Sequence, residues 1–424
     1  MSVIKDEEQR YSYRNFFRYS VYRVTSLSGM GPIFIIASFI MASGYLSRVY
    51  LGIIGILILI VGISLEPLFG YAIDSFQRKS VLKFCIFATI ILLSFSSLMA
   101  LLYGTANLAV LSILLIGADT ITSLVYSTQR VLQQSISRIS LMGKNNGIAE
   151  ITSQLPSMVG SIIAVPIIIY VGFFGAIVFA ILISIISLIL LSRIHEEKMK
   201  VSTERSLKPK ILVDGYLEVF RFLKSNIKIT LFIVTLNFTF ICLMASNYLS
   251  PIYIYKVGGN AGDLAIVEIL YSIFAIISGL IIPRLMERWL SPALIWVFMV
   301  LFATGNILIA MHNSLSFFMI AQPLFFGLGN PSTRMLRNTF VMERIPHEMS
   351  GKFFAGISLI SNMARICIMI VMTSLINILP LQILWKINGA LVLGAVIFSM
   401  YLSIEIKKTG NFIKRKDEPK EETN

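Results

Sequence analysis

Four polar side chains recur at helical spacing in an otherwise apolar stretch, and their types could bind a proton or a polar solute. Asp119, Ser123, Tyr126 and Arg130 stand at positions i, i+4, i+7 and i+11, which places them on one face of a helix. A carboxylate that is shielded from water holds its proton more tightly than one in water. We therefore expect Asp119 to take up and release protons, with a structural pair to Arg23 as the alternative.

A second acidic residue, Glu66, also lies inside a long apolar run. A charge near the centre of a membrane costs about 2.5 to 3.5 kcal/mol on insertion scales, so it needs a partner, a wet cavity or a function. Glu66 is therefore the second candidate for proton coupling. The alternative is an ion pair at an inner gate, with Arg130 or Arg337 as its partner.

Basic and amide side chains in other apolar runs are candidates for contact with a solute. The amides can donate and accept hydrogen bonds to a substrate, although buried amides also hold helices together. Arginines inside a span are expected to set the charge of a substrate cavity. The residues expected to line that cavity are Arg23, Ser123, Tyr126, Asn237, Gln322, Asn362 and Arg365.

The composition indicates that these side chains are carried by membrane-spanning helices. Of the 424 residues, 56% are hydrophobic and only 14% are charged, and the mean hydropathy is +0.81. These values exclude a soluble enzyme, a nucleic-acid-binding domain and a secreted disulfide scaffold. The apolar runs are continuous instead of alternating, which favours helices over a membrane β-barrel. We therefore predict an all-α membrane protein.

A bilayer core needs about 20 apolar residues for each helical span, and twelve runs of this size fit the sequence. One long polar stretch divides them into six and six, as expected for a duplicated transporter with a binding cavity between its halves near the midplane. The predicted domains are residues 1–193, a central loop at 194–227, residues 228–406 and a charged tail at 407–424. Within the loop, Val213 to Leu223 could form an amphipathic helix. The predicted spans are 18–44, 50–73, 81–103, 108–130, 147–170, 174–193, 228–253, 264–283, 292–312, 315–336, 351–376 and 383–405.

The basic residues predict the orientation of the chain in the membrane. The sequence has 36 Lys and Arg against 22 Asp and Glu. Nearly all of the basic residues fall in the two termini, the central loop and the loops on the same side, whereas the opposite loops hold only Arg48, Lys256 and Lys386. By the positive-inside rule, both termini and the central loop are cytoplasmic. We expect a multi-pass protein of a prokaryotic plasma membrane.

The loop after the second predicted span, Gly70-Tyr-Ala-Ile-Asp74-Ser-Phe-Gln-Arg78-Lys79, resembles the loop signature of the major facilitator superfamily. Glycine allows close helix approach, an acidic residue can meet a helix N-terminus, and the basic pair can bind carboxylates or carbonyls. Ser75 and Gln77 replace the arginine and the second glycine of that signature. The resemblance implies an inner gate formed by Gly70, Asp74, Arg78 and Lys79, to which Arg130 is added. We also predict that Asp74 meets the helix start near Ser350 to Lys352 when the cavity opens outward, because a negative charge stabilises a helix N-terminus.

Three further segments are similar to the macrolide-efflux-like branch of the drug:proton antiporters, which also contains siderophore exporters. They are the loop from Arg334 to Lys352, the stretch from Gln129 to Gly147, and the lead-in from Asp214 to Asn226. The fifth span departs from the antiporter pattern of Gly-Pro and Gly-Gly, because it reads Gly160-Ser-Ile-Ile-Ala-Val-Pro166. Its small residues still permit close helix packing.

These observations predict a secondary active transporter that exports a small amphipathic molecule, drug-like or siderophore-like, in exchange for protons. The alternative is an importer or facilitator of an organic anion or metabolite with the same fold, and a non-transporting membrane sensor or scaffold is a third possibility. We expect no enzymatic activity, cofactor or metal, because the three histidines lie in loops or at span ends and no phosphate-binding loop appears. The expected partners are the solute, protons and membrane lipids, with no nucleic acid, and the expected state is a monomer.

Overall fold

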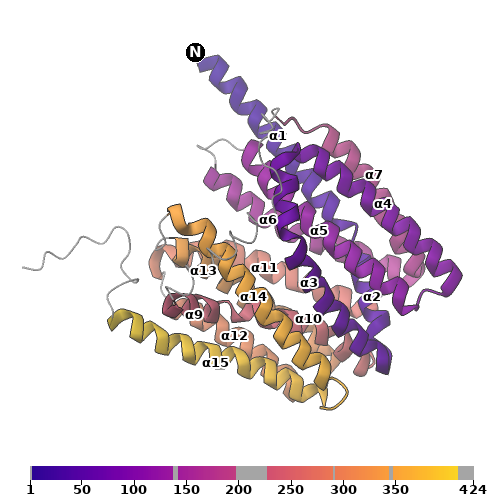
Figure 1. Ribbon diagram of the computed structural model, residues 1–424, viewed down its shortest axis with the longest axis vertical. Helices are drawn as coiled ribbons and strands as arrows, with labels where there is room; N and C mark the ends of the chain where they lie inside the picture. Colours follow the sequence, from indigo (N-terminus) through magenta and orange to yellow (C-terminus); the bar gives the residue numbers. More distant parts are fainter. Residues whose placement is uncertain (1, 137–141, 197–226, 290–291, 343–346, 409–424) are drawn as a thin grey trace, which may run out of the picture. The chain divides into compact units, whose positions relative to one another are not determined.

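The computed structural model describes residues 2–136, 142–196, 227–289, 292–342 and 347–408, and the regular structure in these ranges is entirely α-helical (Figure 1). In the first half the helices are α1 Ser2–Ser28, α2 Gly31–Ala42, α3 Tyr45–Ser75, α4 Arg78–Tyr103, α5 Leu108–Ile136, α6 Met142–Tyr170 and α7 Gly172–Ser192. In the second half they are α9 Ile227–Leu236, α10 Phe238–Lys256, α11 Ala261–Trp289, α12 Pro292–Met311, α13 Leu315–Met342, α14 His347–Leu375 and α15 Leu381–Lys408.

Each of the twelve predicted spans corresponds, to within two residues at its end, to one of these helices or to a consecutive pair of them. The first span corresponds to α1 with α2, and the seventh corresponds to α9 with α10. Within the described ranges, ten helical stretches are long and apolar enough to cross a membrane. Together with their continuous apolar character, this makes the chain an all-α membrane protein.

The surfaces of several helices are suited to lipid and not to water. Ile91 and Leu101 on α4, and Val178 and Leu182 on α7, are each more than half exposed. A water-soluble protein rarely exposes large apolar side chains in such number along the whole length of a helix. In a bilayer these side chains contact acyl chains, and the helical backbone bonds satisfy the main-chain polar groups.

The first span is interrupted between α1 and α2 at Gly29 and Met30. Pro32 lies in the first turn of α2, where its missing N–H leaves the Ser28 carbonyl without the usual helical donor. Helix α6 approaches at this point: a Cβ added to Gly160 would lie 2.7 Å from the Ser28 carbonyl oxygen. The break therefore depends on a proline in α2 and on a glycine in α6.

The seventh span is interrupted between α9 and α10 at Asn237, although no proline or glycine lies within four residues on either side. The Asn237 N–H donates to the Val234 carbonyl at 3.0 Å, and the Ile241 N–H donates to the Asn237 carbonyl at 3.1 Å. The first of these bonds closes a tighter turn than an α-helix does. A side chain that enters the helical ladder is a recognised cause of such a break, and the Asn237 side chain is held by two other helices, as described below.

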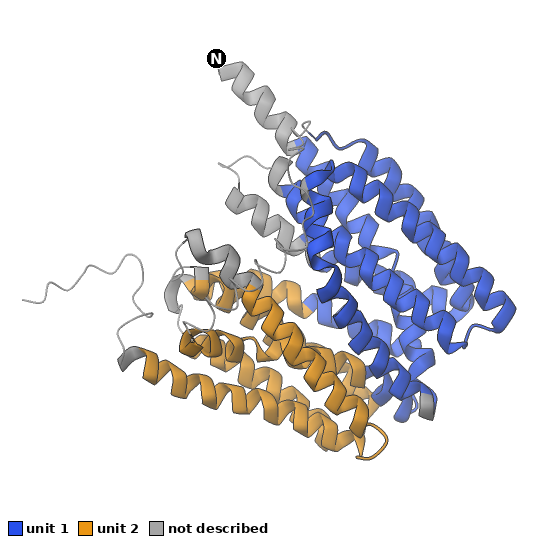
Figure 2. Ribbon diagram, in the orientation of Figure 1, with its two compact units in different colours: residues 1–207, 250–273 blue, residues 208–249, 274–424 orange. Residues whose placement is uncertain are grey.

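The chain divides into two compact units by its internal contacts (Figure 2). Unit 1 consists of residues 1–207 and 250–273, and unit 2 consists of residues 208–249 and 274–424. Residues 250–273, which belong by sequence to the second six-helix set, group with unit 1 by their contacts. Within unit 1, for example, the Tyr255 ring centroid lies 6.1 Å from that of Phe39 and 5.9 Å from Cζ of Arg48.

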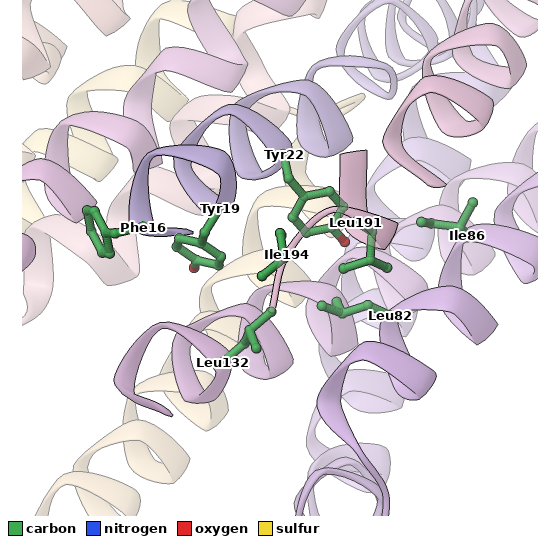
Figure 3. Packing of buried hydrophobic residues seen from close by; sticks show 8 residues of the cluster. All are labelled: Phe16, Tyr19, Tyr22, Leu82, Ile86, Leu132, Leu191 and Ile194. Carbon is green, nitrogen blue, oxygen red and sulfur yellow. The ribbon is translucent and has the colours of Figure 1, made fainter. Parts of the chain in front are cut away.

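A buried apolar cluster in unit 1 joins α1 to three other elements and fixes the position of α1 (Figure 3). Two tyrosines of α1 lie in this cluster with no exposed surface. In a membrane, close van der Waals packing of such side chains holds helices together, so the cluster keeps the residues of α1 in register. Its buried members are Phe16, Tyr19, Tyr22, Leu82, Ile86, Leu132, Leu191 and Ile194.

Candidate functional site

Arg23 of α1 is a buried guanidinium inside unit 1, with only 4% of its surface exposed. One of its terminal nitrogens donates to the Gln133 side-chain oxygen of α5 at 3.2 Å. Its Nε has no hydrogen-bond partner within the described ranges. Arg23 therefore meets a neutral amide, and no described carboxylate lies within 4.0 Å of it.

The polar stripe predicted on the fourth span is present, because residues 108–136 form the continuous helix α5. Asp119, Ser123 and Tyr126 are half-buried, and Arg130 is exposed. The charges of Arg23, Arg130 and Asp119 all act on the Tyr126 hydroxyl. The stripe and the buried arginine of α1 therefore form one electrostatic cluster in unit 1.

The continuation of this stripe was not identified from the sequence. Gln133 lies 14 residues after Asp119, nearly four helical turns, and so shares its face. Gln133 holds Arg23, and the neighbouring Gln129 donates to the Ser26 hydroxyl at 2.9 Å. Extending the helical spacing of the stripe beyond Arg130 would have found Gln133.

In unit 2, Asn237 joins three helices at the break between α9 and α10. Its side-chain nitrogen donates to the Ser361 hydroxyl of α14 at 2.5 Å, and its side-chain oxygen accepts a hydrogen bond from Arg337 of α13. Arg337 also donates to Asn338 at 3.0 Å. Asn237 is only 5% exposed, so the predicted cavity residue lies in a buried polar cluster that includes Ser361, which the sequence did not single out.

A second cationic group of unit 2 is Arg365 of α14. It donates to the Asn362 side-chain oxygen at 3.1 Å and to the Met244 sulfur at 3.4 Å, and its Cζ lies 4.6 Å from the centroid of the Phe240 ring. Stacking on an aromatic face stabilises a guanidinium in apolar surroundings. The predicted cavity residues Arg365 and Asn362 are thus brought together.

Gln322 of α13 is also buried, with 3% of its surface exposed. Its side-chain oxygen has no hydrogen-bond partner in the described part of the chain. Such an amide is available to bind a solute or an ordered water. No contact places it in the Asn237 or Arg365 cluster.

The two halves carry polar side chains at corresponding positions. Arg23 lies 19 residues before the end of α2 at Ala42, and Asn237 lies 19 residues before the end of α10 at Lys256. Arg130 and Arg337 each lie 22 residues after the start of their helices, at Leu108 and Leu315. In each half, therefore, an arginine–amide hydrogen bond links the first and fourth spans, but the arginine lies on opposite members of the pair.

The predicted gate residues are only partly described. Gly70 and Glu66 are exposed on α3, and no described ion pair joins Glu66 to Arg130. The side chain of Asp74 lies outside the described residues. The side chains of Ser350 and Lys352 also lie outside the described residues, so the contact expected between Asp74 and the start of α14 is not described. The predicted amphipathic segment from Val213 to Leu223 and the predicted tail at 407–424 lie outside them too, except for the last two residues of α15.

The basic pair of the gate motif binds the end of α7. Arg78 and Glu196 form an ion pair at 3.7 Å, and the Lys79 side-chain nitrogen donates to the carbonyls of Ser192 at 3.3 Å and Ile194 at 2.5 Å. Glu196 was not identified from the sequence, because it lies more than 100 residues from its partners. The described contacts of Arg78 and Lys79 thus lie within unit 1.

The described residues contain no group of three or more His, Cys, Asp or Glu side chains that could hold a metal ion. The polar side chains of these clusters can recognise a solute by hydrogen bonds and charge, and a carboxylate can bind a proton.

Comparison with known proteins places this arrangement in a wider group. Residues 19–366 match the family model described as the Major Facilitator Superfamily. No curated protein matches the sequence. Among solved structures the chain is similar to the nucleoside transporter NupG, with 13% identity, a TM-score of 0.66, and coverage of 92% of this chain and 99% of that chain.

Two further solved structures share the fold. A bacterial homologue of the iron transporter ferroportin in an inward-facing state has 16% identity and a TM-score of 0.63, covering 93% of this chain and 98% of that chain. The POT family transporter PepTSo has 11% identity and a TM-score of 0.64, covering 94% of this chain and 98% of that chain. At these identities the likeness shows the fold alone.

Proposed function

Since this chain belongs to the major facilitator superfamily, we propose that it is a secondary active transporter that exports a small amphipathic organic molecule in exchange for protons. In this proposal the chain crosses a prokaryotic plasma membrane twelve times, with both termini in the cytoplasm. The two six-helix halves expose a central site alternately to the two sides of the membrane.

The observation that carries the proposal is the pair of arginine–amide links, Arg23 to Gln133, which is buried, and Arg337 to Asn237, which is partly buried. Charged groups at this depth are costly and are usually retained for substrate or ion pathways. Their occurrence on the first and fourth spans of both halves is what a duplicated transporter with a shared central pathway would need.

Proton coupling is assigned to Asp119. The carboxylate is half-buried on an apolar helix, beside the Ser123 and Tyr126 side chains that can exchange hydrogen bonds with it. A carboxylate in such surroundings can be protonated from one side of the membrane and released to the other when the access to water changes. Glu66, which is exposed on α3, is the second coupling candidate.

The proposal is tested by reconstituting the full chain in liposomes that contain a pH-sensitive dye and applying an inward-directed pH gradient. The probes are ethidium and Hoechst 33342 as amphipathic cations, and 1-naphthoate and 1-naphthyl phosphate as amphipathic anions. If the protein exchanges the probe for protons, an outward-directed probe gradient should accelerate the entry of protons into the liposomes. Proton entry equal to that of protein-free liposomes for all four probes would contradict the proposal.

The direction of cargo transport distinguishes an exporter from the alternative, an importer or facilitator of an organic anion or metabolite. Inside-out and right-side-out vesicles from cells that produce the protein should give opposite signs of proton-driven flux. Net probe movement toward the cytoplasmic face under an inward proton gradient would favour the importer. The buried Arg23 is the specific observation in favour of an anionic cargo, and it is considered next.

A further inference from the structure

We propose that Arg23 and Gln133 in unit 1 form a binding site for an oxyanion, a carboxylate or phosphate, carried by the transported molecule. This inference names the cargo's chemical class and rests on the proposed transport function. It arises from one side chain whose burial and hydrogen bonding are otherwise unexplained.

Arg23 is a charge in apolar surroundings. Only 4% of its surface is exposed, and it lies in a stretch apolar enough to cross a membrane. A buried charge needs compensation by an opposite charge and by hydrogen bonds. A guanidinium has five N–H donors, and the described partners of Arg23, the Gln133 side-chain oxygen at 3.2 Å and the Tyr19 hydroxyl, use only part of this capacity.

The described hydrogen-bond partners of Arg23 are neutral groups. The Tyr19 hydroxyl interacts with the guanidinium but donates its own proton to the Gln129 carbonyl at 2.8 Å. No described carboxylate lies within 4.0 Å of Arg23, and its Nε has no hydrogen-bond partner in the described ranges. Among the described residues Arg23 thus has neutral partners only, and in this proposal the cargo supplies the compensating negative charge.

A second guanidinium strengthens the preference for an anion. Arg130 and Arg23 both interact electrostatically with the Tyr126 hydroxyl, and so does the Asp119 carboxylate. Two positive charges and one negative charge therefore lie near Tyr126. Arg130 is exposed and can turn toward an arriving solute. The net positive charge attracts anions, whereas a cationic cargo would be repelled.

The geometry of a guanidinium favours an oxyanion over a simple halide. Its planar fork matches the paired oxygens of a carboxylate or phosphate, and the Gln133 amide and Tyr126 hydroxyl can donate further hydrogen bonds. The ring of Tyr126, which is half-buried, is suited to an aromatic body on the anion. The cargo class is therefore an amphipathic organic carboxylate or phosphate.

The proposal is tested by ligand-induced thermal stabilisation of the purified full chain, from which apparent dissociation constants follow. The probes are 1-naphthoate, its neutral isostere 1-naphthamide, 1-naphthyl phosphate, inorganic phosphate and chloride. We expect 1-naphthoate or 1-naphthyl phosphate to bind at least tenfold more tightly than 1-naphthamide. Comparing the two naphthyl anions identifies which oxyanion is preferred, and inorganic phosphate shows whether the organic body is needed.

The variants are Arg23→Gln and a matched control on the same helix, Arg14→Gln, whose side chain is exposed. Arg23→Gln should weaken binding of the preferred anion at least tenfold and leave naphthamide unaffected, whereas Arg14→Gln should bind as the wild type does. If Arg23→Gln does not purify as a single species, Arg23→Lys replaces it. Lysine keeps the positive charge but lacks the planar, two-pronged guanidinium, so this variant should bind the anion severalfold more weakly than the wild type does.

Three results would overturn the proposal: naphthamide as good a ligand as naphthoate, an Arg23 variant with unchanged anion affinity, or no stabilisation by any anion. Its failure is separable from failure of the proposed function. Proton-coupled flux of ethidium with no anion binding would leave the transporter intact and remove the anion site. Anion binding that depends on Arg23, without any proton-coupled flux, would keep the site and reject proton exchange.

Discussion

Glu196 binds both Arg78 and Lys79, although it lies more than 100 residues after them in the sequence. One carboxylate oxygen lies 3.7 Å from the Arg78 guanidinium, and the other accepts the backbone N–H of Lys79 at 3.1 Å. That N–H is in the first turn of α4, where the helix leaves its donors unsatisfied and favours a negative charge. Glu196 therefore stabilises the start of α4 as well as the arginine placed there.

Other bonds hold the segment after α7 in the same place. The Asn15 side chain donates to the His195 carbonyl at 2.7 Å and accepts the His195 N–H at 2.9 Å, and Arg18 donates to the Arg193 carbonyl at 3.2 Å. The beginning of the central loop is thus fixed to α1 and α4. The basic pair of the loop motif contributes to the stability of the first bundle.

We predict that Glu196→Gln lowers the stability of unit 1 by about 1 to 3 kcal/mol, the cost of losing a buried charge-assisted hydrogen bond and ion pair. The Glu196 side chain is only 5% exposed. The matched control is Glu405→Gln, because Glu405 pairs with Lys228 at 3.5 Å on a more exposed surface, where such pairs contribute about 0 to 1 kcal/mol. Thermal unfolding in detergent measures both variants, and equal losses would contradict the stabilising contact.

Gly160 is predicted to tolerate no side chain. A Cβ at this position would lie 2.7 Å from the Ser28 carbonyl oxygen, so Gly160→Ala must separate α6 from the break between α1 and α2. We expect a loss of about 1 to 3 kcal/mol, typical of overpacking. Gly62→Ala on α3 is the control, since no atom lies within 4 Å of its Cβ, and there alanine should be neutral or stabilise the helix by up to about 1 kcal/mol. Similar thermal unfolding curves for the two variants would show that the close approach is not required.

Asn388 lies at the centre of a buried polar network in unit 2. With no exposed surface, it donates to the Ser246 hydroxyl and the Asn306 side-chain oxygen, each at 2.9 Å, and to the Cys242 carbonyl at 3.2 Å. Interhelical hydrogen bonds of this kind contribute about 0.6 to 2 kcal/mol in membranes.

Asn388→Ala should therefore lower the stability of unit 2 by about 1 to 2 kcal/mol, including the small cavity it leaves. Asn247→Ala removes an exposed amide from α10 and should have almost no effect. Denaturation of both variants in mixed micelles makes the comparison. A loss of stability for Asn247→Ala as large as that for Asn388→Ala would show that the network adds nothing specific.

The sequence predicted the helices well, because membrane-spanning segments are long, continuous and apolar. The interruptions of the first and seventh spans were harder to predict from the sequence. Pro32 marks the interruption after Ser28, since proline is disfavoured inside a helix, but the break at Asn237 has no such residue nearby. It depends on Arg337 and Ser361, which lie 100 and 124 residues further along the chain.

The candidate site was predictable to the extent that its members share one helix. Asp119 and Tyr126 follow from helical spacing alone, and so does the contact between Asn362 and Arg365, which lie three residues apart. The partners across helices were not: Gln133 for Arg23 and Glu196 for Arg78 depend on how the helices pack. One sequence contains no direct signal for contacts of that kind.

The last prediction concerns proton coupling by Asp119. Asp119→Asn keeps the size and the hydrogen bonding of the side chain but cannot exchange a proton, so proton-driven flux of the cargo should fall at least tenfold. Downhill exchange of cargo across the membrane, which requires no net proton movement, should persist because the fold and the Arg23 cluster are kept. Glu66→Gln, at the exposed second candidate, should reduce proton-driven flux less.

Asp263→Asn is the control for loss of a carboxylate, since Asp263 accepts the Asn260 N–H at 2.8 Å at the start of α11 and lies apart from the stripe on α5. Its proton-driven flux should match that of the wild type. Proton-driven flux is measured in proteoliposomes under an imposed pH gradient. Exchange of cargo is measured in the same proteoliposomes at equal pH on the two sides. Because alternating access alone supports exchange at equal pH, a selective loss of the driven flux in Asp119→Asn would assign coupling to this carboxylate. Full proton-driven flux in that variant would remove Asp119 from the mechanism.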